Sequence, residues 1–207
     1  METNLAYQET WREEIVGGEA VMTAPAASAH NRVKNNISEI FTHYLRSKPC
    51  EYLPDGEGLI LAEGTDEYIP DGMVVCDPEK VRHDCVYGAP DLVIEVLSPG
   101  TAKNDRGRKK ETYERCGVRE FWIVDPANRV LEQYVPAAPG ARNSRDAGEA
   151  PGAPDARRFT LREVYHKYSP LERKRMKREE LDAIVTEFRC TLFDDLTIRV
   201  EDVFDRV

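Results

Sequence analysis

The chain of 207 residues carries a net charge of −9 and is 41% hydrophobic and 32% charged, which excludes a disordered chain and suits one domain with its own core. No apolar run approaches the roughly 18 residues of a membrane-spanning helix, and the N-terminus is acidic where a secretory signal would be basic, so we expect a cytoplasmic protein without membrane contact. The acidic total weighs against a general nucleic-acid binder, whose surface is normally basic, although screening limits the reach of distant acids to about 10 Å.

The N-terminal half predicts a hairpin, a long helix and several strands. Residues 11–24 turn at Gly17-Gly18, a pair that is typical of a hairpin. A helix is expected from Ala29 to about Lys48, because its apolar residues recur on one face and Pro49 ends it. The extended segments that follow are Glu51–Leu53, Gly58–Leu61 and Tyr68–Cys76.

The C-terminal half begins with Asp91–Ser98, an apolar strand whose two faces should both be buried. A charged helix over Lys103–Cys116 should end at Gly117. Residues 137–158, rich in Ala, Gly, Pro and Arg, predict a flexible loop inserted in a hairpin. The remaining expected elements are strands Glu120–Val124, Val130–Val135, Ala183–Cys190 and Leu196–Val200, a helix over Leu171–Leu181 and a short helix near Glu201–Asp205. This order predicts one α/β or α+β domain over residues 1–207, with a mixed sheet flanked by helices.

The five cysteines are scattered along the chain and form neither a C-x-x-C motif nor zinc-finger spacing. We expect them to be free, buried thiols in a reducing compartment, because an unpaired cysteine behaves as a small hydrophobic residue.

Glu95 is the most informative residue, because it is a carboxylate inside the aliphatic strand Leu-Val-Ile-Glu-Val-Leu. Alternation places Asp91, Val93, Glu95 and Leu97 on one face of this strand. Burial of an ionised carboxylate costs several kcal/mol unless a metal ion, a basic partner or protonation compensates it. A buried ion pair is the structural alternative to a metal site.

Asp71 offers a second carboxylate at the start of another strand-like run. Two acids on paired strands could share a cation such as Mg²⁺, which prefers hard oxygen ligands and retained waters. The alternative is a turn residue, since Pro-Asp-Gly is a common turn tripeptide.

The helix that follows the Glu95 strand brings Asp105, Lys109 and Tyr113 onto one face at a spacing of four residues. The Pro99-Gly100 break allows this helix to fold back towards the end of the strand. A lysine there could stabilise an attacking hydroxide or the charge that develops on phosphate. A solvated charged face is the alternative.

These residues carry a resemblance to a known family. Asp71, the run from Asp91 through Glu95 to Pro99, Asp105 with Lys109, and the run from Tyr113 to Pro126 resemble the Uma-two family. Its members are described as putative restriction endonucleases of the PD-(D/E)XK nuclease superfamily. The resemblance covers nearly the whole chain except residues 137–158.

The resemblance implies that Asp71 and Glu95 bind Mg²⁺ or Mn²⁺, together with a backbone carbonyl near Val96. In the superfamily pattern a lysine follows the second acid by two residues, but Leu97 stands at that position here. The resemblance therefore points to Lys109 on the next helix. Lys110 ranks second, because it faces about 100° away.

Supporting roles are expected for residues that match the family near its catalytic face. Glu19 could extend the metal shell, and His30 could contact phosphate or cap the helix, although a lone histidine at a helix start is more often structural. Lys103, Arg106 and Lys110 are candidate phosphate contacts. The run Arg173–Arg178 is followed at once by Glu179-Glu180, which favours a solvated helix.

The sequence thus predicts a metal-dependent endonuclease that hydrolyses phosphodiester bonds, with DNA favoured over RNA as the nucleic-acid partner. The alternative is a non-catalytic module on the same fold that binds nucleic acid or protein. Hydrolysis of small phosphoesters is a weaker third option. A homodimer is expected by analogy, because nucleases that cut both strands are commonly dimeric.

Overall fold

The computed structural model describes residues 12–23, 27–63, 65–83, 85–137 and 158–207. The N-terminal elements are β1 (Arg12–Val16), β2 (Glu19–Thr23), α1 (Ser28–Leu45), β3 (Glu51–Pro54), β4 (Gly58–Ala62), β5 (Asp66–Tyr68), β6 (Gly72–Val75), the 3-10 turn η2 (Pro78–Lys80) and β7 (Cys85–Tyr87). They are followed by β8 (Leu92–Val96), α2 (Ala102–Asn104), the π-helical turn η3 (Asp105–Lys109), α3 (Lys110–Cys116), β9 (Glu120–Asp125), β10 (Val130–Pro136) and β11 (Phe159–His166). The C-terminal elements are α4 (Pro170–Arg175), α5 (Arg178–Asp182), β12 (Glu187–Arg189), β13 (Thr197–Arg199) and α6 (Val200–Val203).

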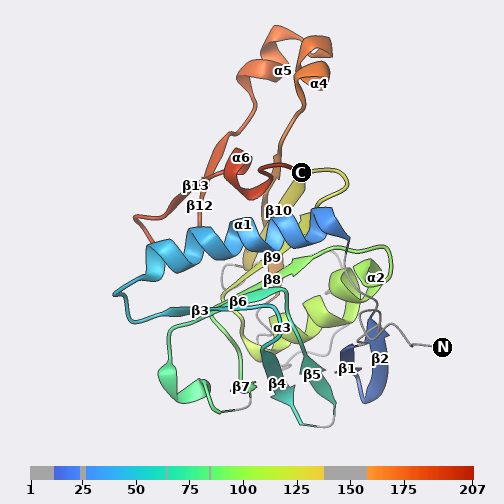
Figure 1. Cartoon of the computed structure of the whole chain (residues 1–207), viewed down its shortest axis with the longest axis vertical. Helices are drawn as coiled ribbons and strands as arrows, with labels where there is room; N and C mark the ends of the chain where they lie inside the picture. The colour runs from blue at the N-terminus through green and yellow to red at the C-terminus, as the bar shows by residue number, and fades with distance from the viewer. Residues whose placement is uncertain (1–11, 24–26, 64, 84, 138–157) are drawn as a thin grey trace, which may run out of the picture.

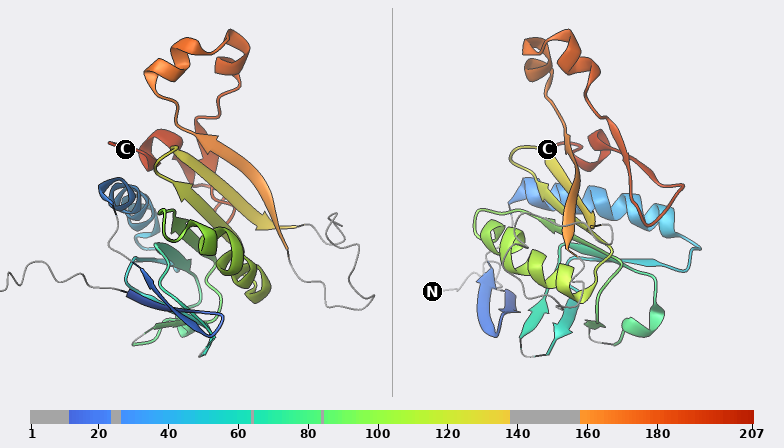
Figure 2. Two further views of the ribbon diagram at one scale, coloured as in Figure 1. Left: turned by 90° about the vertical axis from the view of Figure 1, so that its right-hand side faces the viewer. Right: turned by 180° about the vertical axis from the view of Figure 1, so that it is seen from behind.

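A six-stranded mixed sheet forms the centre, in the order β11-β10-β9-β8-β6-β3. β8 and β9 are parallel, and the other neighbouring pairs are antiparallel. α1 lies against one face of this sheet and α3 lies on the other (Figures 1 and 2). β8 is buried on both faces, as its apolar sequence predicted.

Each face of the sheet has its own hydrophobic core. On the α1 side, Val33, Ile37 and Phe41 pack with Ile94 and Val96 of β8. On the α3 side, Tyr113, Val93 and Phe121 pack with residues of the smaller sheet. Alternation along β8 therefore sends Ile94 and Val96 to one core and Val93 to the other, and Glu95 shares the side of Val93.

A smaller five-stranded sheet, in the order β2-β1-β5-β4-β7, lies beside the central sheet. Its β1–β2 hairpin turns at Gly17 and Gly18, both with positive φ, as the sequence predicted. β12 and β13 form a separate hairpin near the C-terminus. The predicted fold class, a mixed sheet flanked by helices with an N-terminal hairpin and extra C-terminal strands, is confirmed.

Four predicted elements have different bounds in the structure. The long helix ends at Leu45, not Lys48. The predicted strand Tyr68–Cys76 is wrong as one element, because β5 and β6 lie in different sheets. The predicted strand Ala183–Cys190 shortens to β12. The predicted helix over 171–181 is two short helices, since the backbone at Met176 and Lys177 is extended.

Three elements were not predicted: the short η2 and β7, and the eight-residue strand β11. β11 has no apolar alternation because its five central positions, from residue 160 to 164, are all exposed. The predicted loop 137–158 lies almost entirely outside the described residues. The strands on its two sides pair with each other, with Pro136 opposite Phe159, as a hairpin requires. None of the described helices combines the length and the apolar composition needed to cross a bilayer.

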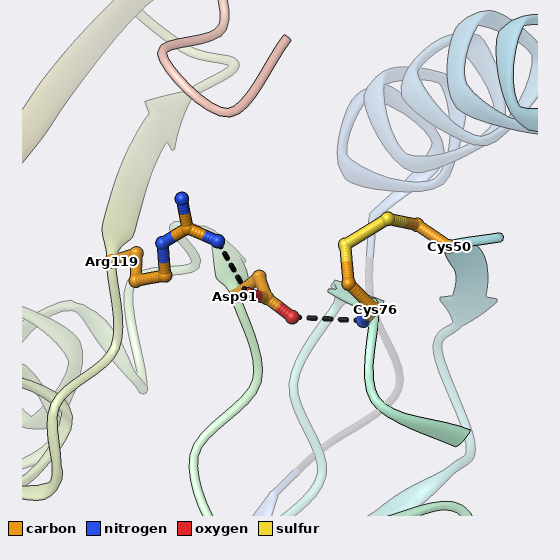
Figure 3. Close-up of a disulfide and its surroundings, with 4 residues drawn as sticks. All are labelled: Cys50, Cys76, Asp91 and Arg119. Atoms are coloured by element: carbon orange, nitrogen blue, oxygen red, sulfur yellow. Dashed lines mark hydrogen bonds and ion pairs between the residues drawn. A yellow bond between two sulfur atoms is a disulfide. The ribbon is translucent and has the colours of Figure 1, made fainter. Parts of the chain in front are cut away.

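The expectation of free thiols is wrong for two of the five cysteines. The register of β3 and β6 pairs Glu51 with Val75, so Cys50 and Cys76 lie opposite each other and form a disulfide (Figure 3). Spacing in the sequence did not reveal this, because the two cysteines come together only when β3 pairs with β6. Of the other three, Cys116 and Cys190 are free thiols.

Candidate active site

Glu95 lies near the C-terminal end of β8, beside the helical segment that follows. Its side chain is only 3% exposed. Oε1 accepts hydrogen bonds from Lys109 Nζ at 3.2 Å and from the Tyr113 hydroxyl at 2.6 Å. The predicted return of this helix towards the strand end is therefore present, and Glu95 has both a charged and a neutral donor.

Lys109 is at the centre of a group of buried acids. Its Nζ lies 2.8 Å from Glu14 Oε1, 3.2 Å from Glu95 Oε1 and 3.6 Å from Asp105 Oδ1. Lys109 itself is 3% exposed. One ammonium group thus faces three carboxyl groups inside the protein. Its single positive charge cannot neutralise all three carboxyl groups if they are ionised.

Asp71 approaches the same strand end from the neighbouring strand. The antiparallel register pairs Gly72 with Ile94, and one step further it sets Asp71 opposite Glu95. Asp71 Oδ2 accepts a hydrogen bond from the backbone N–H of Val96 at 2.7 Å. The Asp71 carboxylate therefore accepts the hydrogen bond that a backbone carbonyl would accept if β6 and β8 were paired further. The interpretation of Pro-Asp-Gly as a turn did not anticipate this contact.

Gly72 has a packing role next to Asp71. A Cβ built on Gly72 would lie 2.2 Å from the Tyr52 hydroxyl of β3. A side chain at this position would displace Tyr52 and the start of β6. Glycine is therefore required after Asp71, because Tyr52 of β3 lies so close. The same contact fixes the backbone next to Asp71.

Helix α1 supplies a second group of polar residues around Asp71. His30 Nε2 lies 3.4 Å from Asp71 Oδ2, and Lys34 Nζ lies 3.6 Å from Asp71 Oδ1. Lys34 Nζ also binds Asp55 Oδ2 at 2.6 Å. His30 and Lys34 are four residues apart and share the face of α1 that meets the strand ends.

Burial shifts the pKa values of two acids in this group. Burial raises the pKa of Glu95 well above its ordinary value; the Lys109 ammonium opposes this shift, and Asp105, Asp71 and Glu14 add to it. Burial also raises the pKa of Asp105 to about 6, again against the influence of Lys109. The acids therefore compete for one cation, and protons replace the missing positive charge.

The pKa values of Lys109 and Tyr113 are both raised. Burial lowers the pKa of Lys109, but the carboxylates of Glu95, Glu14 and Asp105 outweigh it, so the net pKa lies above the ordinary value. Burial, and then the charge of Glu95, raise the pKa of the Tyr113 hydroxyl. Both groups therefore remain protonated donors near neutral pH.

The helical segment that carries these residues is not one regular helix. α2 leads into the π-helical turn η3, and α3 follows and ends at Gly117 in the left-handed conformation (φ 91°). The turn contains a kink at Gly107, whose φ and ψ (−104°, −107°) are not helical. The kink lies between Asp105 and Lys109, and both side chains face Glu95, so the predicted i, i+4 contact forms.

Other predicted site residues lie apart from this group. Glu19 is exposed at the turn of the hairpin, opposite Val16. Glu14, two residues before Val16, is the hairpin acid that reaches Lys109. Lys103 is exposed, Arg106 forms an ion pair with Glu132 at 2.8 Å, and the Lys110 ammonium lies 3.8 Å from the centre of the Tyr134 ring.

Three residues of the group were not predicted from sequence: Glu14, Lys34 and Asp55. Glu14 shares the inward face of β1 with Val16, but alternation alone did not mark it, because the hairpin holds several acids. Lys34 lies one turn after His30, which was a weak signal. Asp55 carried none, because it meets Lys34 only through the pairing of β3 with β6.

The group offers the donors that a divalent ion needs. Carboxyl groups outnumber ammonium groups five to two: Glu14, Asp55, Asp71, Glu95 and Asp105 against Lys34 and Lys109. Asp105 Oδ1 is buried and has no hydrogen-bond partner among the described residues, although Lys109 Nζ lies 3.6 Å away. Within the described ranges, no three His, Cys, Asp or Glu side chains form a ready ligand group. Mg²⁺ commonly binds one or two carboxylates and retains waters, so Asp71 and Glu95 with the Val96 carbonyl fit it.

Comparisons with known proteins place the chain in a family. Residues 1–156 match a family model described as "Uma2: Putative restriction endonuclease". The chain belongs to the Uma2 family. Every residue of the polar group described above lies within the match, whereas β11, α4 and α5 lie beyond it.

Two relatives of this Uma2 protein are uncharacterised proteins of Synechocystis sp. (strain ATCC 27184 / PCC 6803 / Kazusa). One, sll1609, is 27% identical over 130 residues, which cover 61% of this chain and 73% of the relative. The other, slr1290, is 31% identical over 137 residues, which cover 64% and 72%.

A solved structure of similar fold is described as "a putative nuclease belonging to DUF820" from Anabaena variabilis ATCC 29413. It superposes with a TM-score of 0.63 at 15% identity, covering 97% of this chain and 94% of that one. At this identity the likeness shows the fold that the two proteins share.

Proposed function

We propose that this Uma2 protein is a metal-dependent endonuclease that hydrolyses phosphodiester bonds in DNA. The observation that carries the proposal is the arrangement at the end of β8: Asp71 binds the Val96 N–H, and Glu95 binds buried Lys109. The family supports a phosphodiester hydrolase. The metal dependence and the DNA substrate are our inference from the excess of acids and the family's description.

The two strand acids and the Val96 carbonyl would hold Mg²⁺ or Mn²⁺. Such an ion, when bound, polarises the scissile phosphate and lowers the pKa of a water ligand. The hydrogen bond from Val96 fixes one Asp71 oxygen, and the Tyr113 hydroxyl and Lys109 fix one Glu95 oxygen. These contacts orient both carboxylates before the substrate arrives, as an active site on rigid strands requires.

Lys109 acts as a charge and a donor. Its pKa lies above the ordinary value, so it does not serve as a general base near neutral pH. From its position beside Glu95 it would orient the attacking water or stabilise negative charge that develops on the phosphate. His30, beside Asp71, has a buried Nδ1 without a hydrogen-bond partner in the described chain; it would position Asp71 from α1.

The test is cleavage of duplex DNA with Mg²⁺ or Mn²⁺ by the variants Asp71→Asn and Glu95→Gln. Both should lose at least about a hundredfold in rate, as for removal of one essential charge-stabilising group. Asp91→Asn is the matched control. Asp91 also accepts a backbone N–H from the paired strand, that of Cys76 at 2.8 Å, but at the opposite end of β6 and β8 (Figure 3). A site variant that cuts as fast as the wild type would refute the proposal.

One observation favours a non-catalytic module as the second candidate. Glu95 Oε1 already accepts bonds from Lys109 and Tyr113, and the described residues hold no ready group of three ligands. Thermal melting with and without Mn²⁺ separates the two. An ion that binds only the folded state raises the melting temperature by mass action. A melting temperature that millimolar Mn²⁺ leaves unchanged would therefore favour the non-catalytic module.

A further inference from the structure

The segment between β11 and β12, residues 167–186, is called the arm here. It carries α4 and α5 and stands away from the rest of the molecule in every view (Figures 1 and 2). Of its own apolar side chains, Leu171, Met176, Leu181, Ile184 and Val185, none is buried. Twenty residues of ordered chain therefore project from the body without a core of their own.

Exposed apolar side chains gather on this arm and on the strand that leads into it. The large hydrophobic residues that are exposed in the described part of the chain number four: Leu161 (46%), Val164 (43%), Leu171 (60%) and Val185 (43%). All four fall within residues 159–186. Single exposed hydrophobic residues need no explanation, but here all four lie on one projecting segment and the strand that leads into it, which makes this segment a candidate interaction surface.

β11 presents this surface at an open edge of the central sheet. It is the last strand in the order, so one side of its backbone has no strand partner among the described residues. A bulge separates the pairs Gln133–Glu163 and Tyr134–Leu161. Because of it, Phe159 packs in the core on the α3 side and Tyr165 in the core on the α1 side. Leu161 and Val164 therefore both face the α3 side of the sheet.

The charges of this region differ from those of the rest of the protein. Residues 159–186 contain seven Lys or Arg and five Asp or Glu, a balance of +2, whereas the whole chain carries −9. The residues outside 159–186 thus sum to −11, so the rest of the molecule is acidic and does not favour contact with a second copy. α4 ends in Arg173, Lys174 and Arg175. α5 carries Glu179, Glu180 and Asp182 against one basic residue, Arg178, which pairs with Asp182 at 3.1 Å, so two of the three acids are in excess.

We propose that β11 and the arm form a docking surface for a second copy of this chain. In a two-fold arrangement the same patch meets itself, so the basic end of α4 on one chain would face the acidic α5 of the other, twice. The apolar residues of β11 and the arm would be covered together. The proposal rests on this surface alone and is independent of the nuclease assignment.

The test is the molar mass of the full-length protein, measured by sedimentation equilibrium over a range of concentrations. The wild type should dimerise. The pair Leu161→Asp/Val164→Asp and the pair Leu171→Glu/Val185→Glu should each raise the dimer dissociation constant at least about tenfold. Circular dichroism checks that each variant is folded, and Glu39→Lys, an exposed position on α1, should leave the mass unchanged.

A charge exchange makes the test independent of folding. One variant carries Arg173→Glu/Lys174→Glu/Arg175→Glu, and the other carries Glu179→Lys/Glu180→Lys/Asp182→Lys. Each alone should be monomeric, because like charges then meet at both contacts. Mixed together they should form a heterodimer, because both contacts again pair opposite charges.

Two results would overturn the proposal. One is a wild type that remains monomeric at every concentration; if the α4 reversal then weakens binding to duplex DNA, the arm is a nucleic-acid contact instead. The other is a pair of charge variants that fail to associate when mixed although both are folded.

Discussion

At the scale of single residues, Lys109 connects the structure of the site to its stability. It is surrounded by Glu14, Glu95 and Asp105. Because these residues are buried, water does little to compensate their charges. A buried charge that loses its partner is costly, even where the pair itself adds little net stability. Lys109 is therefore required for folding as well as for the proposed chemistry.

We expect Lys109→Met to lower the free energy of unfolding by about 3–5 kcal/mol at neutral pH, because it leaves three acids without their ammonium group. Part of this loss should return in mild acid, where the carboxyl groups take up protons. Urea denaturation at two pH values measures both effects. Lys110→Met, next along the chain but over the Tyr134 ring, should cost under about 1 kcal/mol. Equal losses for the two variants would contradict the assignment.

Asp105 makes the stability of the metal-free protein depend on pH. Its pKa in the folded state is about 6, against an ordinary value of 3.8. Because the folded state holds this proton more tightly, the contribution is fully present below 3.8 and is lost as pH rises through 6. Asp105→Asn should therefore raise the melting temperature in EDTA at pH above 6, and the gain should shrink between pH 6 and pH 4. A gain that grows in acid would show that the sign is wrong.

Part of the residue-level site was visible in the sequence. Glu95 stands out as a carboxylate in an aliphatic strand, and helical spacing joins Asp105, Lys109 and Tyr113 without knowledge of the fold. Glu14 did not stand out, because the hairpin sequence has several acids and only the packing of β1 selects the inward one. Residues four apart on a helix are neighbours whatever the rest of the fold, so their contacts can be predicted from sequence. Contacts between strands depend on the register of pairing, which the sequence does not show directly.

At the scale of elements, the pairing of β3 with β6 shows this dependence. The same register that sets Cys50 opposite Cys76 at one end brings Asp55 near Asp71 at the other, where Lys34 bridges them. α1 was predicted well because its period extends over 18 residues, and the five-residue β8 because it lies in a nearly unbroken apolar run. β7 and β12 have three residues each, too few for a periodic signal, and β11 is exposed over its centre.

The disulfide should stabilise this pair of strands. It closes a loop over a sequence separation of 26 residues, which corresponds to about 3.5 kcal/mol on the loop-entropy estimate. Reductant should therefore lower the urea midpoint of the wild type to that of Cys50→Ser/Cys76→Ser and should leave the double variant unchanged. Cys116→Ser, which replaces a free cysteine, should still respond to reductant. A wild type whose midpoint ignores reductant would show that the bond does not contribute.

At the scale of the whole molecule, the net charge of −9 opposes the approach of nucleic acid. The predicted phosphate contacts compensate little of it. Arg106 is neutralised by Glu132, and Lys110 lies over Tyr134, which leaves Lys103 as the exposed lysine of α2. A divalent ion between the strand acids and a phosphate would therefore have to supply much of the attraction.

This charge distribution predicts how binding to DNA responds to ions. With a hydrolysis-resistant phosphorothioate duplex, fluorescence anisotropy should show weaker binding in EDTA than in Mg²⁺. A plot of the logarithm of the association constant against that of the monovalent salt concentration should have a shallow slope, because few phosphates are neutralised by side chains. Lys103→Ala should reduce that slope by about one. Arg106→Ala should change it far less, because Glu132 already neutralises that guanidinium. Equal effects of the two substitutions, or binding that ignores EDTA, would place the phosphate contacts elsewhere on the protein.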